Sequence, residues 1–368
     1  MKIGILGFGS MGKTHTYALK NIPFFFDCDY DVEVLSICTK HLDKAKQIAA
    51  RYGIKSYTDN EDDIIYDSEI DTIDICTPNV YHYETAKKAI LAGKNVYCEK
   101  PLGVTYKQAL ELSCLAKEKN VKCGMVFNNR FLLPIMKAKE LIEEDKLGRI
   151  LSFNVRYLHS SALDTVKNAG WKQDKDICGG GVLFDLGSHA VDLIYYLCGE
   201  FKSVLGKGQI AYPERTGVNG EKWQTNADEA FYMVATLKNG AYGTLEVSKI
   251  VTGSNDDLTL EIHGEKGSVR FNLMDPNFLE YYSLEDGSQR GYTKIECVNR
   301  YPYPSGIFPG VKAPVGWLRG HIGNYFNFVD CVINEKEIHP DFTDGAYVQL
   351  VLENAYLSDQ RKCEVEIC

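Results

Sequence analysis

Hydrophobic and polar residues alternate with two different periods through the first 127 positions. Short apolar or alternating runs typical of strands occur at 2–6, 32–38, 71–76 and 122–126, and a fifth begins at Asn95. Between them apolar residues recur at helical spacing, as in 42–52 before Gly53 and from Tyr83 to Ile90 before Gly93. Strands that alternate with helices predict a parallel sheet with crossover helices, so residues 1–127 are expected to form an α/β Rossmann-type domain.

The pattern changes beyond residue 130. A helix is predicted over 133–144, and most segments from 150 to 298 have the alternation and the turn residues typical of strands. Examples are 231–237, 241–247, 258–263 and 268–273, with one helical segment near 182–197. Val348, Val351, Leu352 and Ala355 repeat at helical spacing, so the C-terminal helix is expected to pack back on the core. Residues 128–368 are predicted to form an α+β domain built on a mostly antiparallel sheet.

Length and charge limit the possible classes of protein. A chain of 368 residues is longer than an ordinary domain with a single hydrophobic core, and its length is typical of two domains. A formal net charge of -9 is unfavourable for nucleic acid and for anionic membrane surfaces, so we expect neither as a partner. No run of 18 apolar residues and no secretory signal is visible, and the twelve cysteines are scattered without a Cys-x-x-Cys pair. These features predict a cytoplasmic protein with reduced thiols.

A glycine-rich motif follows the first predicted strand. Gly7-Phe8-Gly9-Ser10-Met11-Gly12 matches G-x-G-x-x-G, which by itself is weak evidence for nucleotide binding. Here a strand precedes the motif and a helix follows it, so helix amides would hold the pyrophosphate of a dinucleotide. The alternative is a glycine-rich turn that binds nothing, and the strand-turn-helix context favours the dinucleotide.

The end of the second predicted strand bears on the choice between NAD(H) and NADP(H). An acidic residue there would hydrogen-bond the adenine ribose, but this chain has Thr39-Lys40-His41. Without the carboxylate a 2′-phosphate is not repelled, and Lys40 has the charge to pair with it, which favours NADP(H) over NAD(H). The alternative is a solvated Lys40 beside a Thr39 that tolerates either cofactor.

A lysine follows the strand that begins at Asn95. Lys100 lies just before Pro101, which does not continue strand pairing, so Lys100 is expected at the carboxyl end of that strand. Ligands of open α/β sheets bind at this edge, which makes Lys100 a candidate for chemistry. A solvated strand-end lysine is the alternative.

Four motifs together resemble a known family. They are Gly7 to Gly12, Cys76-Thr77-Pro78-Asn79 with His82, Glu99-Lys100-Pro101, and Gly179-Gly180-Gly181 leading to Asp185-Leu186-Gly187-Ser188-His189. In order and spacing they resemble the Gfo/Idh/MocA oxidoreductases, and the resemblance covers nearly the whole chain. The combination of Glu-Lys-Pro with Asp-x-Gly-x-His is far more specific than the glycine motif alone.

The resemblance implies a Rossmann domain followed by an α+β domain with a large open sheet. It implies hydride transfer between a nicotinamide and a carbon of a sugar or cyclitol such as inositol, with Lys100, Asp185 and His189 as the catalytic group. Further implied cofactor contacts are Thr77, Pro78, Asn79, His82, Glu99, Lys100, Trp171 and Lys172. Many relatives have Asp where this chain has Thr39, which leaves the identity of the cofactor open. We expect a homo-oligomer, a dimer or tetramer, formed through the open sheet.

The chemistry of alcohol oxidation assigns a role to each of these residues. A base must take the hydroxyl proton, and His189 is the best candidate, with Asp185 four residues earlier placed to orient the imidazole if the segment is helical. Lys100 would hydrogen-bond the same oxygen and stabilise developing alkoxide character, so all three would contact the substrate. The alternative for Asp185 and His189 is an ordinary helix pair, with Asp192 as a second carboxylate. No further His or Cys stands at ligand spacing, so no metal site is predicted.

Two further segments are candidates for substrate contacts. Asn128, Asn129 and Arg130 follow the last Rossmann strand, and their amide and guanidinium groups suit a polyhydroxylated ligand; a hinge is the equal alternative. The segment from Tyr301 to His321 is rich in aromatic residues, Pro and Gly. Stacking against sugar rings and a subunit interface are both consistent with that composition.

The combined interpretation is an NAD(P)-dependent oxidoreductase that acts on a sugar, a sugar derivative or inositol. One alternative is a glycoside-cleaving enzyme in which tightly bound NAD oxidises the sugar transiently, without net redox change. The other is a dinucleotide-sensing regulator without enzymatic activity, and the presence of Lys100, Asp185 and His189 weighs against it because a sensor needs no proton-transfer group.

Overall fold

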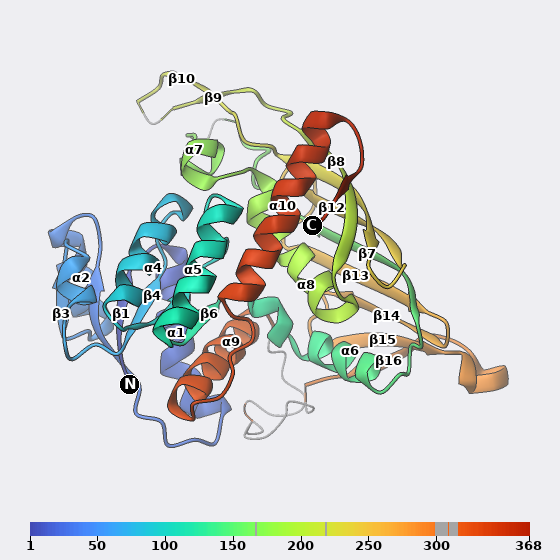
Figure 1. The fold of residues 1–368 in the computed structure, drawn as a ribbon, viewed down its shortest axis with the longest axis horizontal. Coiled ribbons are helices and arrows are strands. Elements are labelled where there is room, and N and C mark those ends of the chain that lie inside the picture. Colours follow the sequence, from blue (N-terminus) through green and yellow to red (C-terminus); the bar gives the residue numbers. More distant parts are fainter. Residues whose placement is uncertain (166–167, 218, 299–307, 309–315) are drawn as a thin grey trace. The chain divides into compact units, whose positions relative to one another are not determined.

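The fold is known from a computed structural model, which describes residues 1–165, 168–217, 219–298, 308 and 316–368. Figure 1 shows the helices and strands in chain order. The chain forms two compact units. The first consists mainly of Met1–Asn128 and His321–Tyr347, and the second mainly of Asn129–Tyr301 and Val348–Cys368.

The first unit contains a six-stranded parallel sheet in the order β3-β2-β1-β4-β5-β6. Its strands are β1 (Lys2–Leu6), β2 (Glu33–Cys38), β3 (Ser56–Thr58), β4 (Thr72–Ile75), β5 (Asn95–Cys98) and β6 (Cys123–Met125). Nearly every residue of β1, β2, β4 and β5 is buried, as expected of strands covered on both faces. This confirms the predicted parallel sheet.

The connections between these strands are mostly helical. They are α1 (Ser10–Phe25), α2 (Leu42–Tyr52), α3 (Asp62–Ile65), the 3₁₀ turn η1 (Asn79–Tyr81), α4 (His82–Leu91) and α5 (Tyr106–Lys119). Helix α2 ends as predicted at Gly53, whose φ of 66° is the left-handed conformation that glycine adopts without strain. Helices α4 and α5 pack against each other (Figure 1). Strand order and crossovers together make this a Rossmann-type domain.

The structure divides the chain differently from the predicted boundary at residue 128. Residues 321–347, which contain most of helix α9 (Gly316–Ile333), belong to the first unit and not to the second. The Tyr325 hydroxyl donates to Asp74 at 2.7 Å, and the Asn324 amide donates to the Met125 carbonyl at 3.1 Å. The Phe26 and Phe326 rings stack with centroids 3.7 Å apart. These partners are about 200 residues or more apart in the sequence, so no local pattern indicates them.

The second unit is built on a nine-stranded sheet in the order β16-β15-β14-β13-β7-β12-β11-β8-β17. Its strands are β7 (Ile150–Leu158), β8 (Phe201–Gln209), β11 (Ala230–Leu237), β12 (Tyr242–Ser248), β13 (Asp257–Gly264), β14 (Gly267–Asn272), β15 (Phe278–Ser283), β16 (Thr293–Glu296) and β17 (Val365–Glu366). Strands β9 (Glu214–Thr216) and β10 (Lys222–Gln224) form a separate two-stranded sheet. Among the pairs of the large sheet in the described residues, only β7 and β12 run parallel. The prediction of a large, mostly antiparallel sheet is confirmed.

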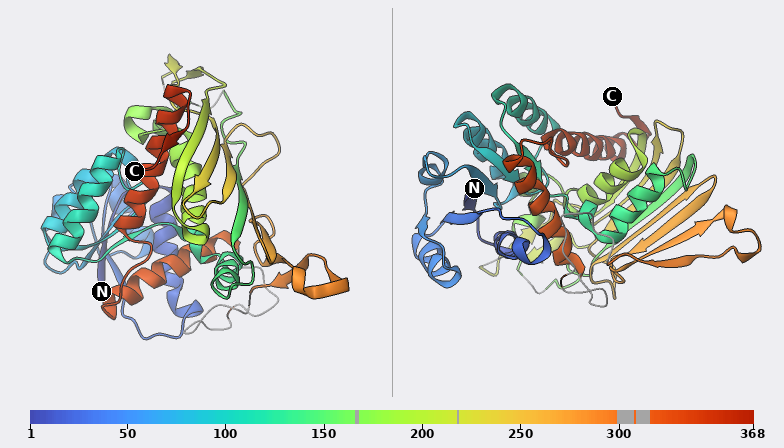
Figure 2. Two further views of the ribbon diagram at one scale, coloured as in Figure 1. Left: turned by 45° about the vertical axis from the view of Figure 1, so that its right-hand side comes forward. Right: turned by 90° about the horizontal axis from the view of Figure 1, so that it is seen from below.

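Helices cover one face of this sheet, as Figure 2 shows for α6 (Leu133–Glu143), α8 (Ser188–Cys198) and α10 (Phe342–Arg361). The segment of α10 from Val348 onward is tied to β8, since the Ser358 hydroxyl accepts the Gly206 N–H at 3.0 Å. The strand residues that point away from the helices include Leu205, Tyr232, Val234 and Tyr242, whose side chains are exposed. Smaller elements are η2 (Asn128–Phe131), η3 (Trp171–Gln173), α7 (Lys175–Cys178), the π turn η4 (Leu183–Gly187) and η5 (Leu284–Gln289).

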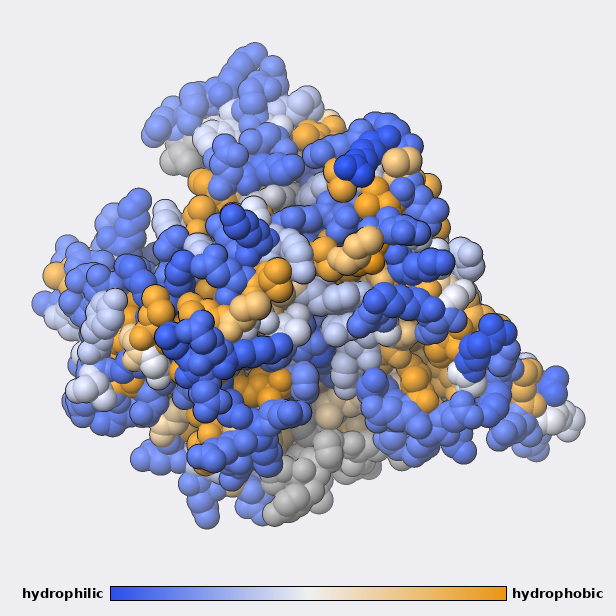
Figure 3. Space-filling model, viewed as in Figure 1, coloured by the Kyte–Doolittle hydropathy of each residue, from blue (hydrophilic) through white to orange (hydrophobic). Residues whose placement is uncertain are grey.

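Hydrophobic side chains are mostly inside. Hydrophilic residues predominate on the face seen in Figure 3, with hydrophobic ones interspersed. The stretch Lys175–Cys198 has the length and hydropathy of a membrane span, but 83% of its most apolar window is buried inside the fold, as in the core helix of a soluble protein. This stretch is therefore weak evidence for a membrane segment.

All twelve cysteines lie among the described residues and are thiols, and seven are buried. Burial raises the pKa of Cys38 and of Cys178 to about 11 and that of Cys198 to about 12. These three side chains therefore stay protonated at neutral pH and pack as small, weakly polar groups.

Candidate active site

The glycine motif forms the turn between β1 and α1. Gly7 has a φ of 90°, and a Cβ there would lie 2.7 Å from the Cys76 carbonyl oxygen. A Cβ at Gly12 would lie 2.4 Å from the Gly7 carbonyl oxygen. A Cβ at Gly9 would meet no atom within 4 Å, so the backbone there borders open space. Gly7 and Gly12 are needed for packing, and Gly9 keeps the approach to the helix unobstructed.

The first turn of α1 suits an anionic ligand. The helix begins at Ser10, its N-cap Gly9 has no side-chain hydrogen bond, and no acidic residue occupies the first turn. The first amides of a helix have no partner within the helix, and they carry the positive end of its dipole. The residues present therefore fit a dinucleotide pyrophosphate at this position.

Thr39 and Lys40 follow Cys38 of β2, which pairs with Leu6 just before the glycine loop. The Thr39 hydroxyl donates to the His41 carbonyl at 3.0 Å, which shapes the turn after β2, and the Lys40 side chain is exposed. A pocket of about 420 Å³ adjoins the loop, and its lining includes Phe8, Lys13, Lys44, Arg51 and Tyr52. Three of these side chains are cationic, so this part of the first unit suits a phosphate-bearing ligand.

His82 links two loops of the first unit and is fully buried. Its Nδ1 lies 2.7 Å from the Pro101 carbonyl oxygen, and its Nε2 lies 2.9 Å from the Thr77 carbonyl oxygen. Burial lowers the pKa of His82, although both carbonyls oppose this effect. A neutral imidazole has one N–H, so it donates to one of the two carbonyls at a time. The structure gives His82 a role in holding the loops together, and its contact with a cofactor stays a prediction.

Lys100 lies two residues beyond the carboxyl end of β5, as predicted, and is half-buried. Two hydrogen bonds fix the backbone at Glu99 and Lys100. The Glu99 N–H donates to the Ile75 carbonyl at 3.0 Å, and the Lys100 N–H donates to Oε2 of the buried Glu99 side chain at 3.1 Å. Thr77, Pro78 and Asn79 follow the adjacent strand β4, so the two motifs end neighbouring strands of the sheet.

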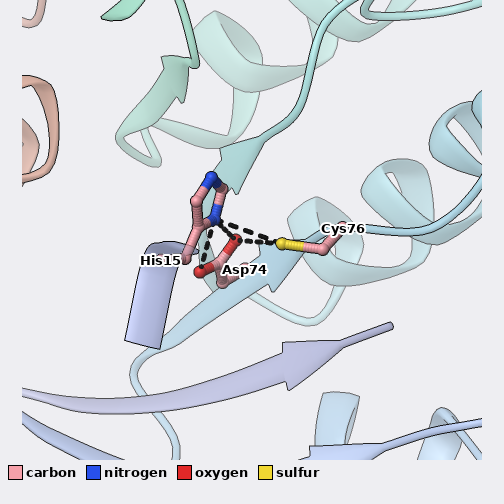
Figure 4. Close-up of side chains that lie close together, drawn as sticks. All are labelled: His15, Asp74 and Cys76. Atoms are coloured by element: carbon pink, nitrogen blue, oxygen red, sulfur yellow. Dashed lines mark hydrogen bonds and ion pairs between the residues drawn. The ribbon is translucent and has the colours of Figure 1, made fainter. Parts of the chain in front are cut away.

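Sequence analysis missed a polar cluster beneath these loops, which we call the His15 cluster: the buried His15, Asp74 and Glu99 together with the half-buried Cys76. Figure 4 shows His15, from α1, pointing at Asp74 on β4, with Cys76 beside them. One signal was available. Asp74 stands between Ile73 and Ile75 in a strand predicted to be buried, and a buried carboxylate requires a partner.

The second unit contains Asp185 and His189. Asp185 lies in the π turn η4, and His189 lies in the first turn of α8. The Asp185 carboxylate accepts hydrogen bonds from Lys172 at 3.0 and 2.8 Å and forms an ion pair with Lys249 at 2.7 Å. Sequence analysis missed Lys249, which directly follows β12 and has no motif around it.

A π turn has more residues per turn than an α-helix, so the four-residue spacing does not by itself align Asp185 with His189. That Asp185 orients the imidazole stays a prediction.

A network around Asp228 sets the start of the segment that carries Asp185 and His189. The Asp228 carboxylate accepts the N–H groups of Gly181 and Leu183, each at 3.1 Å, and the Tyr356 hydroxyl donates to the same carboxylate. A Cβ on Gly181 would lie 2.2 Å from the Asp228 carbonyl oxygen, so only glycine fits there. The Gly-Gly-Gly motif thus allows close packing that positions the two candidate residues.

The other predicted residues have contacts of their own. Arg130 is buried, and its guanidinium group binds Asp192 through Nε at 3.0 and 3.1 Å and through Nη2 at 2.5 Å. This ion pair favours a structural role for Arg130, and its contact with substrate stays a prediction, as does that of the buried Asn128. Trp171 is partly exposed, with the Lys172 ammonium 5.6 Å from its ring centre. Tyr301 and most of the aromatic segment lie outside the described residues.

Comparisons with known proteins match both units. Residues 1–127 match the family described as "Oxidoreductase family, NAD-binding Rossmann fold", and residues 135–270 match the "GFO/IDH/MocA C-terminal domain". Levoglucosan dehydrogenase of Pseudarthrobacter phenanthrenivorans is 31% identical over 366 residues, covering 95% of this chain and 94% of the relative. Glucose-6-phosphate 3-dehydrogenase of Bacillus subtilis is 28% identical, covering 97% and 96%.

Solved structures give the same result. Levoglucosan dehydrogenase in complex with NADH aligns with a TM-score of 0.97 at 31% identity, covering 100% of this chain and 99% of the other. The complex with NADH and levoglucosan has a TM-score of 0.96 at the same identity and coverage. The fold, the order of the motifs and the named relatives therefore agree.

Proposed function

Because this chain belongs to the GFO/IDH/MocA family of NAD-binding oxidoreductases, we propose that it transfers a hydride between the nicotinamide and a secondary alcohol or ketone carbon of a sugar, sugar derivative or inositol. The observation that supports this most is Lys100 at the carboxyl edge of the Rossmann sheet that also carries the glycine loop. Named relatives that act on sugars, aligned over nearly the full chain, support the substrate class.

Each candidate residue has a role that follows from its chemistry. The bound nicotinamide supplies the hydride acceptor or donor. For alcohol oxidation, a ring nitrogen of His189 takes the hydroxyl proton, and the Lys100 ammonium stabilises negative charge that develops on a substrate oxygen. In the reverse direction the same groups return the proton. Asn128 and Arg130 remain proposed contacts for the further hydroxyl groups of the substrate.

The charges around Asp185 support the proposed site in the second unit. One carboxylate lies between two ammonium groups, Lys172 and Lys249, so the three side chains together have a net positive charge. A fixed positive charge stabilises negative charge that develops on a substrate oxygen. The two lysines also hold the Asp185 side chain in one orientation, which favours a preorganised site over a mobile surface residue.

For the cofactor, the chain has an NAD-binding domain, and we propose that it also accepts NADP(H). The absence of a carboxylate from residues 39–41 and the exposed Lys40 support this proposal, as do Lys13, Lys44 and Arg51 around the adjoining pocket. The remaining proposed cofactor contacts are Phe8, Ser10, Met11, Thr77, Pro78, Asn79, Glu99 and Trp171.

We predict that Thr39→Asp shifts cofactor selectivity toward NAD(H). A carboxylate about 4 Å from a phosphate costs roughly 1–4 kcal/mol, so the Kd for NADPH should rise at least about fivefold. The Kd for NADH should stay constant or fall, because the new carboxylate can bind the ribose hydroxyls. Fluorescence titration with both reduced cofactors measures the ratio, and Lys40→Met should change it in the same direction. An unchanged ratio in both variants would mean that this turn does not contact the ribose.

The proposed function is tested by absorbance at 340 nm with the purified protein, NAD or NADP, and a panel of sugars and inositols. Bound nicotinamide is measured first, by mass spectrometry of the denatured protein. Reduction of added NAD(P) that depends on one sugar class supports the proposal. Glycoside cleavage without net reduction would establish the redox-neutral alternative, and cofactor binding without turnover of any substrate would favour a sensor.

We further propose a cytoplasmic homo-oligomer that binds neither nucleic acid nor membranes. The exposed Leu205, Tyr232, Val234 and Tyr242 side chains on β8, β11 and β12 support association through this face of the large sheet. The net charge of -9 is unfavourable for nucleic acid and anionic membrane surfaces, and the free thiols of the described residues are consistent with a reducing compartment such as the cytoplasm. A monomeric mass at micromolar concentration in light scattering would refute the oligomer.

A further inference from the structure

A continuous chain of buried hydrogen bonds in the first unit ends at the backbone of Lys100. The Tyr325 hydroxyl donates to Asp74, Nδ1 of His15 lies 2.9 and 3.1 Å from the two Asp74 oxygens, and Nε2 of His15 lies 3.2 Å from Oε1 of Glu99. Oε2 of Glu99 accepts the Lys100 N–H at 3.1 Å. His15, Asp74 and Glu99 are almost entirely inaccessible to solvent. This series of hydrogen bonds thus connects α1, β4 and the end of β5 beneath the cofactor loop.

Two carboxylates on opposite sides of one imidazole determine its protonation. A neutral imidazole has one N–H, and its other nitrogen would present a lone pair to a carboxylate oxygen. In a buried site such an unmatched pair of acceptors is costly, whereas an imidazolium donates from both nitrogens. One positive charge on His15 also offsets part of the negative charge on Asp74 and Glu99.

The distances distinguish this arrangement from a metal site, although His15, Asp74 and Cys76 have ligand-type atoms within 4.8 Å of one another. Ligands about 2.0–2.3 Å from a tetrahedral zinc lie roughly 3.3 Å or more apart. The 2.9 Å between His15 and Asp74 and the 3.1 Å between His15 and Cys76 are shorter, and they match direct hydrogen bonds. Asp74 is in addition engaged by Tyr325.

The groups that surround His15 are consistent with a charged ring. Burial is the largest single effect and lowers the pKa of His15, but the polar neighbours of the ring, Asp74 first among them, together outweigh it, so the pKa is raised well above its ordinary value. Burial raises the pKa of the Cys76 thiol and of the Tyr97 and Tyr325 hydroxyls, so these neighbours stay neutral. Burial, and then the charge of His15, lower the pKa of His321, whose ring lies 6.2 Å away.

We propose that His15 is a positioning residue: as an imidazolium held between Asp74 and Glu99, it orients the Glu99 carboxylate, which in turn holds the Lys100 backbone. The functional half of this inference rests on the proposed role of Lys100. The geometric half, a doubly protonated His15, does not. Because the two halves have different readouts, a failure of either one is recognised separately.

The protonation state is measured by NMR on protein with ¹⁵N-labelled histidine rings. We expect one of the eight histidines to keep both ring nitrogens protonated above pH 8, and its signals to disappear in His15→Gln. In Glu99→Gln, which retains a hydrogen-bonding oxygen but not the charge, the same ring should deprotonate at a lower pH. A His15 ring that is neutral, or that titrates near 6.5 as an unperturbed histidine does, would overturn the proposal.

Folding raises the pKa of His15, so the sign of the pH dependence is defined. The stability that the imidazolium contributes is fully present below the unfolded pKa of about 6.5 and is lost as the pH rises through the folded pKa. The difference in Tm between the wild type and His15→Gln should therefore be largest in mild acid and should shrink in alkaline buffer. A difference that is constant with pH would indicate a purely steric effect of the substitution.

The positioning role is tested by a double-variant cycle with Lys100→Met. Displacement of a reacting group by about 1 Å can cost about 10²-fold, so His15→Gln and Glu99→Gln should each lower kcat about 10- to 100-fold. In the Lys100→Met background, His15→Gln should cause no further loss, because both changes act through the same group. Thr16→Val, on the same helix, removes a hydroxyl bonded to the Gly12 carbonyl and serves as the structural control, with kcat unchanged.

Additive losses in the double variant would overturn the positioning role, since His15 would then act independently of Lys100. The same conclusion would follow if Thr16→Val and His15→Gln lowered kcat equally. If Lys100→Met retained full turnover, the catalytic role of Lys100 would fail instead, and the NMR result would still decide the protonation of His15.

Discussion

Lys100→Met should lower kcat about 10²- to 10⁴-fold, the range expected when a group that stabilises charge or transfers a proton is removed. The Kd for NADH should change less than about threefold, because the pyrophosphate is expected at the first turn of α1, which this variant leaves intact. Methionine keeps most of the length and apolar surface of lysine, so the loss reports the ammonium group. Single-turnover kinetics and NADH fluorescence titration measure the two quantities separately.

Lys94 offers a matched control at the opposite end of the same strand. It directly precedes β5, and its ammonium donates to the Asp67 and Ile70 carbonyls at 2.6 and 2.7 Å. Lys94→Met removes an equal charge and two hydrogen bonds, so it should lower stability and leave kcat unchanged. If Lys100→Met were as active as Lys94→Met, Lys100 would be a strand-end lysine without a chemical role.

His189→Ala is expected to lower kcat by a similar factor of about 10²- to 10⁴-fold, because the hydroxyl proton loses its acceptor. The imidazole is mostly buried in the first turn of α8, with the Tyr157 ring centre 6.1 Å from its own. Its removal leaves a cavity of the shape of the lost ring, so added imidazole should restore part of the activity. Restoration that rises with imidazole concentration and saturates would distinguish a proton-transfer group from a packing residue.

His263 is the control for this variant, since it lies on β13 of the same unit and is partly exposed. His263→Ala should leave kcat unchanged and should not respond to imidazole. If His189→Ala loses activity that imidazole does not restore, and its Tm falls in parallel, the residue supports the fold of α8 and another group is the base. If it keeps wild-type turnover, His189 is not part of the mechanism.

The two largest expected effects concern residues in different units of the chain. Lys100 belongs to the first unit, and His189 belongs to the second together with Asp185, Lys172 and Lys249. Both losses should be seen in kcat with cofactor binding retained. A variant that loses cofactor binding as well would have disturbed the Rossmann fold, and its kinetics would carry no mechanistic information.

Local pattern was sufficient for most of the Rossmann fold and for the identity of the candidate residues. The spacing of apolar residues in a strand or helix depends on which of its faces is buried. In the first 127 residues this spacing can therefore be read within each element, without knowledge of its neighbours. The glycine motif, Lys100 before Pro101, and Asp185 with His189 are local strings that keep their spacing in any conformation. These features are therefore recognisable from the sequence alone.

The tertiary structure decided which distant side chains meet. His15 and Asp74 are 59 positions apart, and Lys249 and Asp185 are 64 apart, so no periodicity indicates that either pair is in contact. The same holds for residues 321–347, which the sequence pattern assigns to the second domain, whereas their contacts with β4 and β6 place them in the first unit. Arg130 was predicted on its chemistry, but its partner Asp192 is known only from the fold. Burial changes the chemistry of such groups, because a charge removed from water needs a partner that only folding supplies.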